Sequence, residues 1–259
     1  MKDDQPKLTD KATPPIRDIN ELLEGLAKDS TQIVASSSTI EQAKKLGLKF
    51  DRQTPKTNEE FIDELFAARK EKALLTISKL PEPPQIAVPP INSLYDEIRE
   101  CILFGLNGAA ITLSAILVEF ALKHAIIDHK TGITEYSKEE WDRLENIELG
   151  PVIKEAFESK VISEESRKEL DKFRKDVRNL YLHYNIKKIT SSAVMQEVAR
   201  LDISTGKIVI EKNLKAEDHP FIWQMAKKKM DEASVMNIFS FADSVVKSLF
   251  RQEQQDKKD

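Results

Sequence analysis

Three residues within one short run carry the side chains that metal-free cleavage of RNA requires. The run R-N-L-Y-L-H places Arg178, Asn179 and His183 near the end of an amphipathic helical segment. Cleavage of this kind needs a group that takes the proton from the ribose 2′-hydroxyl, a group that protonates the leaving oxygen, and positive charge beside the phosphorane. A histidine, with a reference pKa of about 6.5, can transfer the protons, and an arginine can pair with two phosphate oxygens. Asn179 could orient the phosphate or the imidazole by hydrogen bonding.

The spacing of the run constrains how these residues can combine. On a regular helix Asn179 and His183 share a face, whereas Arg178 points about 140° away from His183. The helix must therefore distort or end within the run, or one site must combine residues from two chains.

The elements that must position these residues are predicted to be helices. The chain has 259 residues with only 7 glycines, which disfavours hairpin-rich folds and the glycine loops that cradle phosphates. Its net charge of −4 argues against a general coat for nucleic acids, although local charge matters more for one active site. One stretch, L-D-I-S-T-G-K-I-V-I-E, alternates apolar and polar residues across a glycine and predicts a hairpin near residues 203–210. We expect an all-α fold: a helical bundle with one small β-hairpin and an N-terminal arm that is helical and extended.

The sequence pattern divides the chain into three parts. Residues 1–90 read as an arm, because prolines lie near both ends and the amphipathic pieces are short. Residues 80–90 should form a stiff linker, because their prolines lack amide donors and fix an extended backbone. Residues 91–250 form the helical domain, and 251–259 a charged, mobile tail. The short amphipathic pieces of the arm begin after Asp18, near Ile40 and at Thr57.

Several residues signal where helices begin. Ser137 with Glu140, and Thr57 with Glu60, have the spacing of capping boxes, and Ser163 precedes the helix that carries the run. In the domain, one expected helix begins at Asn92 or Ser93, the next covers about residues 109–129, and two more begin at Ser137 and at Ser163. The last two expected helices cover about residues 193–200 and about residues 221–250.

The most apolar stretch, residues 108–127, approaches the length of about 20 residues that crosses a bilayer. Glu119 and Lys123 would be costly near the bilayer centre, whereas a helix inside a bundle needs only a partner for each, so we expect a buried helix and no membrane contact. The single cysteine, Cys101, excludes a disulfide within one chain and fits a reducing compartment. Because the first residues also lack the apolar stretch of a secretory signal, we expect a cytoplasmic protein.

The run and the helices before it resemble a known superfamily. An arginine, a polar residue, a short spacer and a histidine resemble the R-x4-6-H signature of the higher eukaryote and prokaryote nucleotide-binding domains, abbreviated HEPN. The stretch L-Y-D-E-I-R-E-C-I-L-F-G-L-N-G-A-A-I-T-L-S-A-I-L-V-E is similar to the first two helices of an uncharacterised bacterial branch of that superfamily. The resemblance covers residues from about 92 to 250, leaves the arm outside, and departs from a plain bundle at the hairpin.

The resemblance implies a helical bundle that forms a homodimer, in which two copies of the motif face each other and cut RNA without a metal or another cofactor. Arg178, Asn179 and His183 match the motif residue by residue, and Glu119 would be the acidic residue of the second helix that holds Arg178. Such proteins often act as toxins or antiviral effectors, which would add an antitoxin or another regulatory protein as a partner. A structural ion pair is the alternative for Glu119, and a chance string or an inactive domain is the alternative for the motif.

Cationic and aromatic residues surround the motif and could contact phosphates or stack on bases. The candidate RNA-binding residues are Arg174, Lys175, Tyr181, Tyr184, Lys187 and Lys188. The alternatives are aromatic packing beside the core stripe and a solvated helix face with i,i+4 pairs to Asp171 and Asp176.

No metal site is expected. His124 and His129 lie five residues apart, with no cysteine nearby and no carboxylate at the spacing of zinc proteases. His219 precedes Pro220 in an expected loop and receives no role.

The sequence thus favours a dimeric, metal-independent endoribonuclease. His183 would be the general acid or base, Arg178 would stabilise the phosphorane and Asn179 would position the substrate. The alternative is a non-catalytic HEPN-like module that binds a protein partner or a nucleotide. In that alternative the N-terminal arm would be the docking element. A third possibility is that residues 1–80 of the arm wrap the bundle and block its groove as an autoinhibitor.

Overall fold

The computed structural model describes residues 57–132, 137–202 and 207–250. Its contacts divide the described chain into two units: Val194–Leu214 belongs to one, and the remaining described residues form the other, which is helical. The expected short helices after Asp18 and near Ile40, and the expected tail over 251–259, lie outside the described residues.

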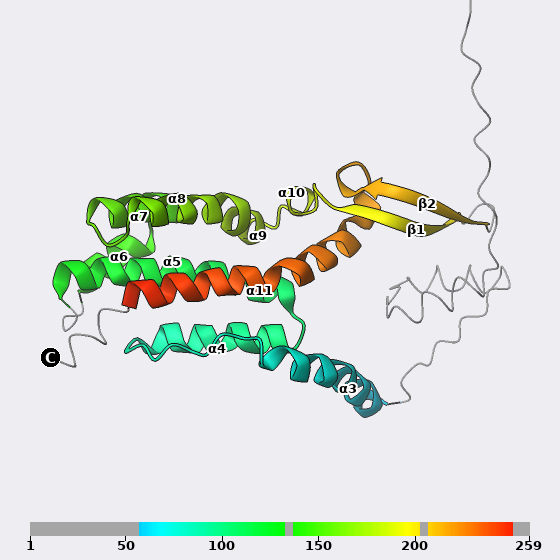
Figure 1. The fold of residues 1–259 in the computed structure, drawn as a ribbon, viewed down its shortest axis with the longest axis horizontal. Coiled ribbons are helices and arrows are strands. Elements are labelled where there is room, and N and C mark those ends of the chain that lie inside the picture. Colours follow the sequence, from blue (N-terminus) through cyan, green and yellow to red (C-terminus); the bar gives the residue numbers. More distant parts are fainter. Residues whose placement is uncertain (1–56, 133–136, 203–206, 251–259) are drawn as a thin grey trace, which may run out of the picture. The chain divides into compact units, whose positions relative to one another are not determined.

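The described fold is mostly helical, with a single two-stranded antiparallel hairpin, which confirms the expected fold class (Figure 1). The helical unit contains α3 (Asn58–Ile77), α4 (Pro89–Leu103), α5 (Asn107–Thr131), α6 (Lys138–Glu145), α7 (Leu149–Glu158), α8 (Glu164–Phe173), the π-helical η1 (Arg174–Arg178), α9 (Asn179–Leu182), α10 (Ile186–Ile189), the 3-10 turns η2 (Ala216–Asp218) and η3 (Pro220–Ile222), and α11 (Trp223–Phe250).

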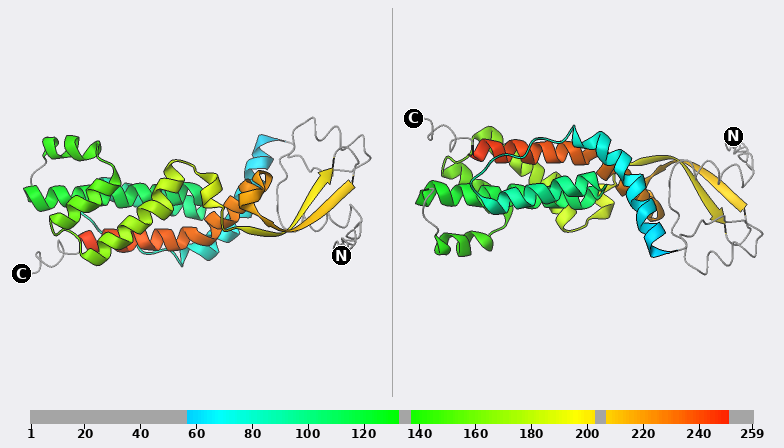
Figure 2. Two further views of the ribbon diagram at one scale, coloured as in Figure 1. Left: turned by 90° about the horizontal axis from the view of Figure 1, so that it is seen from above. Right: turned by 90° about the horizontal axis from the view of Figure 1, so that it is seen from below.

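Helix α5 forms the centre of the helical unit. It packs against α4 and α11, and α7, η1 and α9 also contact it (Figures 1 and 2). Ile111, Leu117, Leu122 and Ile126 of α5 are fully buried. By length and composition α5 is the one described helix that could cross a membrane, but 67% of its most apolar window is buried inside the bundle. The expected burial of this helix is therefore confirmed, because its apolar face packs on neighbouring helices.

Side-chain caps begin α3, α6 and α8 where the sequence predicts them. In α3, the Glu60 amide donates to Thr57 Oγ1 at 3.1 Å and the Thr57 amide donates to Glu60 Oε2 at 3.1 Å, which completes a capping box. Ser137 and Ser163 each accept a hydrogen bond from the amide three residues later.

Helix α4 begins earlier than its polar residues suggest. Pro89 and Pro90 occupy its first turn, where a missing amide hydrogen leaves no bond unmade. The expected cap Asn92 lies inside the helix and donates through Nδ2 to the Ile86 carbonyl at 2.7 Å. The prediction that Asn92 or Ser93 starts this helix was therefore wrong.

The proline-rich stretch before α4 packs onto the helical unit. Leu80, Ile86 and Val88 are buried in the core, and Lys247 Nζ of α11 lies 3.3 Å from the Glu82 carbonyl oxygen. Residues 80–88 of the expected linker form neither helix nor strand, whereas Pro89 and Pro90 belong to α4. The apolar side chains of this stretch join it to the helical unit, and the contacts do not divide the chain at residue 90.

The hairpin is longer than predicted. β1 (Val194–Asp202) pairs with β2 (Lys207–Lys215), and Lys212 Nζ lies 3.3 Å from Glu197 Oε1. The helix expected over about 193–200 was wrong, because a short run such as V-M-Q-E-V fits a helical period and a strand equally well. Pairing with the alternating strand β2 decides the outcome.

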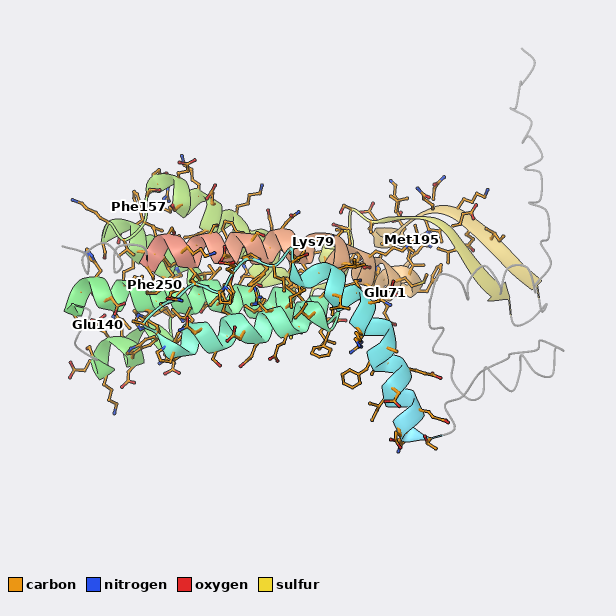
Figure 3. All side chains as sticks on the ribbon, turned by 60° about the horizontal axis from the view of Figure 1, so that its bottom comes forward. Glu71, Lys79, Glu140, Phe157, Met195 and Phe250 are labelled. Atoms are coloured by element: carbon orange, nitrogen blue, oxygen red, sulfur yellow. The ribbon has the colours of Figure 1, made fainter. Side chains whose placement is uncertain are left out.

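An ion-pair network joins α6 to its neighbours. Arg143 of α6 pairs with Glu140 at 2.7 Å and with Glu155 of α7 at 2.6 Å, and Lys130 of α5 contacts both carboxylates. Figure 3 labels Glu140, which projects from α6. Hydrogen bonds from Arg143 lower the pKa of Glu155 from its ordinary 4.5 to about 2.

Candidate functional site

The helix that carries the motif changes its winding at Arg178. It begins at the Ser163 cap, runs as α8, turns into the π-helical η1 over Arg174–Arg178, and continues as the short α9. A π-helical turn inserts extra chain and shifts the faces that follow it. The helix therefore both distorts at the start of the motif and ends within it, as the spacing of Arg178 and His183 requires.

The end of α9 leaves His183 exposed. His183 is the C-cap, with φ −94° and ψ 6°. The amide of Asn185 donates to the Leu180 carbonyl at 2.8 Å, and the amide of Tyr184 donates to the Tyr181 carbonyl at 3.1 Å. This is the bond pattern of a Schellman motif, in which the residue after the C-cap is left-handed, and Tyr184 has φ +46°.

Arg178 is held by the carboxylate of α5 that the resemblance implicates. Its Nε and Nη2 both lie 3.1 Å from Glu119 Oε2, and Nη1 donates to Asn179 Oδ1 at 3.3 Å. The side chains of Arg178 and Glu119 are only 16% and 17% exposed, so the pair lies mostly out of solvent. The expected contact between Glu119 and Arg178 is present, and it also orients the amide of Asn179.

Lys123 completes this cluster and was missed as a site residue. Its Nζ lies 3.0 Å from Glu119 Oε1, the oxygen farther from Arg178, and 3.5 Å from the Glu145 carbonyl oxygen. Lys123 is buried, with 7% of its surface exposed. The i,i+4 spacing of Glu119 and Lys123 was the available signal. One carboxylate between two cations leaves the cluster with one net positive charge, which favours an anion beside it.

His183 stands apart from this cluster within one chain. In the part of the chain that the structure describes, the imidazole makes no hydrogen bond to Arg178, Asn179 or Glu119. The structure thus brings Arg178, Asn179 and Glu119 together and leaves His183 free at the end of the same helix.

The two tyrosines of the motif differ in their surroundings. Tyr181 is half-buried, and its hydroxyl donates to Asp231 Oδ1 of α11 at 2.6 Å. Burial, reinforced by this hydrogen bond, raises the pKa of Tyr181. Tyr184 is 64% exposed. Tyr181 therefore packs, which was the alternative to stacking, and Tyr184 remains accessible to a base.

The cations near the motif also divide into two groups. Arg174 and Lys175 pair with Asp171 at 2.7 Å and 2.6 Å, which is the intrahelical alternative weighed from the sequence. Lys187 and Lys188 are exposed on α10, and their ammonium groups make no ion pair with any described residue. The lysines of α10 are therefore the free positive charges closest in sequence to His183.

His124 has a structural environment. Its Nδ1 lies 2.8 Å from Asp128 Oδ2, and its ring contacts the rings of Trp141 and Phe250. Among the described residues no group of three or more histidine, cysteine or acidic side chains could hold a metal ion.

Comparisons with protein families, with curated proteins and with solved structures gave no match.

Proposed function

We propose that this chain is a metal-independent endoribonuclease of the HEPN type, active as a homodimer. His183 transfers protons, Arg178 stabilises the charge of the phosphorane, and Asn179 positions the phosphate. Following the resemblance, its role is that of a toxin or an antiviral-defence effector, held in check by an antitoxin or another regulatory protein.

One arrangement carries the proposal. Glu119 of α5 holds Arg178 beside Asn179, and the helix that contains Arg178 and Asn179 ends at an exposed His183. A fixed guanidinium suits a phosphorane, because donors that are already oriented need no reorganisation during the reaction. An exposed imidazole suits proton transfer to a substrate that arrives from solvent. The net positive charge of the cluster of Glu119, Lys123 and Arg178 supports binding of a phosphate.

The chemistry needs one basic and one acidic group. The ribose 2′-oxygen bonds to phosphorus as its proton passes to the base, and the bond from phosphorus to the 5′-oxygen breaks as that oxygen takes a proton from the acid. The products are a 2′,3′-cyclic phosphate and a 5′-hydroxyl. Two copies of His183, one neutral and one protonated, supply both groups when two chains meet at this face.

A second function is favoured by a specific observation. The side chain of Arg178 is 16% exposed and already paired with Glu119, as in a structural ion pair. A non-catalytic HEPN-like module that binds a protein partner or a nucleotide would keep this pair for folding alone.

Cleavage in the presence of a chelator separates the two functions. Purified full-length chain is incubated with total RNA and excess EDTA, beside His183→Ala and the control His129→Ala. His129 is exposed near the end of α5, and its side chain makes no hydrogen bond or ion pair within the described chain. We expect His183→Ala to lose at least about 100-fold in rate and His129→Ala to match wild type. Equal rates for wild type and folded His183→Ala, or no cleavage by wild type, would remove the nuclease proposal.

A further inference from the structure

One ammonium group of α11 contacts the chain on both sides of His183. Lys227 Nζ lies 5.1 Å from the ring centroid of Tyr181 and 5.7 Å from that of Tyr184. Such contacts between a cation and an aromatic face are attractive, and more strongly so where water is excluded. The side chain of Lys227 is only 12% exposed and Tyr181 is half-buried, whereas Tyr184 is 64% exposed, so the contact with Tyr181 is the better shielded of the two.

A buried carboxylate fixes Lys227 in this place. Asp231 is 6% exposed, pairs with Lys227 one helical turn away, and accepts the Tyr181 hydroxyl. The first turn of α5 closes the other side: a Cβ on Gly108 would lie 2.8 Å from Asp231 Oδ2. Asp231 therefore has little room to move, and Lys227 is held with it.

The backbone at Tyr184 is left-handed, with φ +46°. A left-handed conformation is unfavourable for a residue other than glycine, because its Cβ approaches the backbone. Helix α4 ends with the same bond pattern, and there the left-handed position is Gly105, with φ +71°. At the end of α9 the position holds an aromatic residue instead, and the ring of that residue contacts Lys227.

We infer that Lys227 and Asp231 are positioning residues for His183: they clamp Tyr181 and Tyr184 and so fix the turn from which the imidazole projects. This inference rests on the proposed function for its catalytic consequence. Its physical part, an ordered turn at His183, stands on these contacts alone.

The test compares variants that keep the lysine stem. Lys227→Met removes the ammonium group, Lys227→Arg retains a cation, and Lys229→Met is the control, since Lys229 is exposed and makes no ion pair among the described residues. Lys227→Met leaves the charge of Asp231 buried without its cation. A double variant that combines Lys227→Met with Asp231→Asn is therefore made as well. In the double variant, the amide oxygen of the asparagine introduced at position 231 can still accept a hydrogen bond from the Tyr181 hydroxyl, and no net charge is buried.

Two quantities are measured: the NMR order parameters of the backbone amides of residues 183–185, and kcat and KM for RNA cleavage. We expect both Lys227→Met and the double variant to lower backbone order at the turn and to reduce kcat at least about tenfold with KM nearly unchanged. Lys227→Arg should restore both, and Lys229→Met should match wild type. Unchanged order in the folded double variant, or an equal loss in Lys229→Met, would overturn the clamp. If wild type leaves RNA intact, the proposed function fails, and the NMR comparison alone still decides whether Lys227 orders the His183 turn.

Discussion

Replacing Glu119 with glutamine should destabilise the protein far more than removal of an ordinary surface charge. Its carboxylate serves two cations, Lys123 at 3.0 Å and Arg178 at 3.1 Å, whose side chains are 9% and 16% exposed. Removing one partner of a fully buried ion pair costs about 3–5 kcal/mol, because the other charge is left uncompensated. Residual exposure, and a hydrogen bond that the glutamine oxygen can still accept, lower this to about 2–4 kcal/mol for Glu119→Gln.

The matched control is Glu158→Gln on α7. Glu158 lies 3.7 Å from Lys154, again at i,i+4 spacing, but these side chains are 62% and 75% exposed. Solvent screens such a pair, so its loss should change stability by less than about 0.5 kcal/mol. A third variant, Glu119→Gln with Lys123→Met, removes one of the two uncompensated cations and should recover part of the loss.

The assay is equilibrium unfolding in urea, followed by far-ultraviolet circular dichroism, with the free energy of unfolding extrapolated to water. The reasoning predicts that Glu119→Gln is the least stable variant and that the added Lys123→Met change is stabilising. A free energy for Glu119→Gln within about 0.5 kcal/mol of wild type would refute it. So would a further loss on adding Lys123→Met, because the two cations would then not share the carboxylate.

Three further predictions concern stability. The pKa of Glu155 is about 2 in the folded chain, against an ordinary value of 4.5. The ionised Glu155 therefore stabilises the fold fully above about pH 4.5, and this stabilisation is lost as pH falls toward 2. The urea midpoints of wild type and Glu155→Gln should converge over that window, and a constant gap between them would contradict this reasoning. Gly108→Ala should destabilise the fold by about 1–3 kcal/mol, because the new Cβ would lie 2.8 Å from Asp231 Oδ2. The control Gly150→Ala should be neutral or stabilising, because its Cβ would meet no atom closer than 3.5 Å. Equal effects of the two variants would show that the surroundings of Gly108 can relax. Lys160→Gly should stabilise by up to about 1 kcal/mol in thermal melts, since Lys160 is exposed with φ +61°, and a loss of stability would show that its side chain contributes there.

The helix starts show how far the sequence predicts the fold. Thr57, Ser137 and Ser163 act locally, through an amide three residues later, so their spacing alone predicts the caps. Strand β1 could not be predicted in this way, since it forms by pairing with β2 rather than by local preference. The start of α4 was missed because prolines suit the first turn of a helix as well as they suit an extended linker.

The contacts of the site likewise include some that the sequence predicts and some that it does not. The contact of Glu119 with Arg178 was expected from resemblance, and Lys123 follows from its spacing to Glu119 along one helix face. The contacts of Lys227 with Tyr181 and Tyr184 join α9 to a helix more than 40 residues later, since position 227 lies 43 residues after position 184. No periodic pattern predicts such a contact, because it depends on how α9 and α11 pack on α5.

The end groups of the RNA fragments test the proposed chemistry most directly. RNA treated with the wild-type chain in excess EDTA should yield fragments with 2′,3′-cyclic phosphate and 5′-hydroxyl ends, and the same fragments should be missing after treatment with His183→Ala. Fragments with 3′-hydroxyl and 5′-phosphate ends, or cyclic-phosphate fragments in equal yield from both proteins, would contradict a 2′-hydroxyl attack that depends on His183.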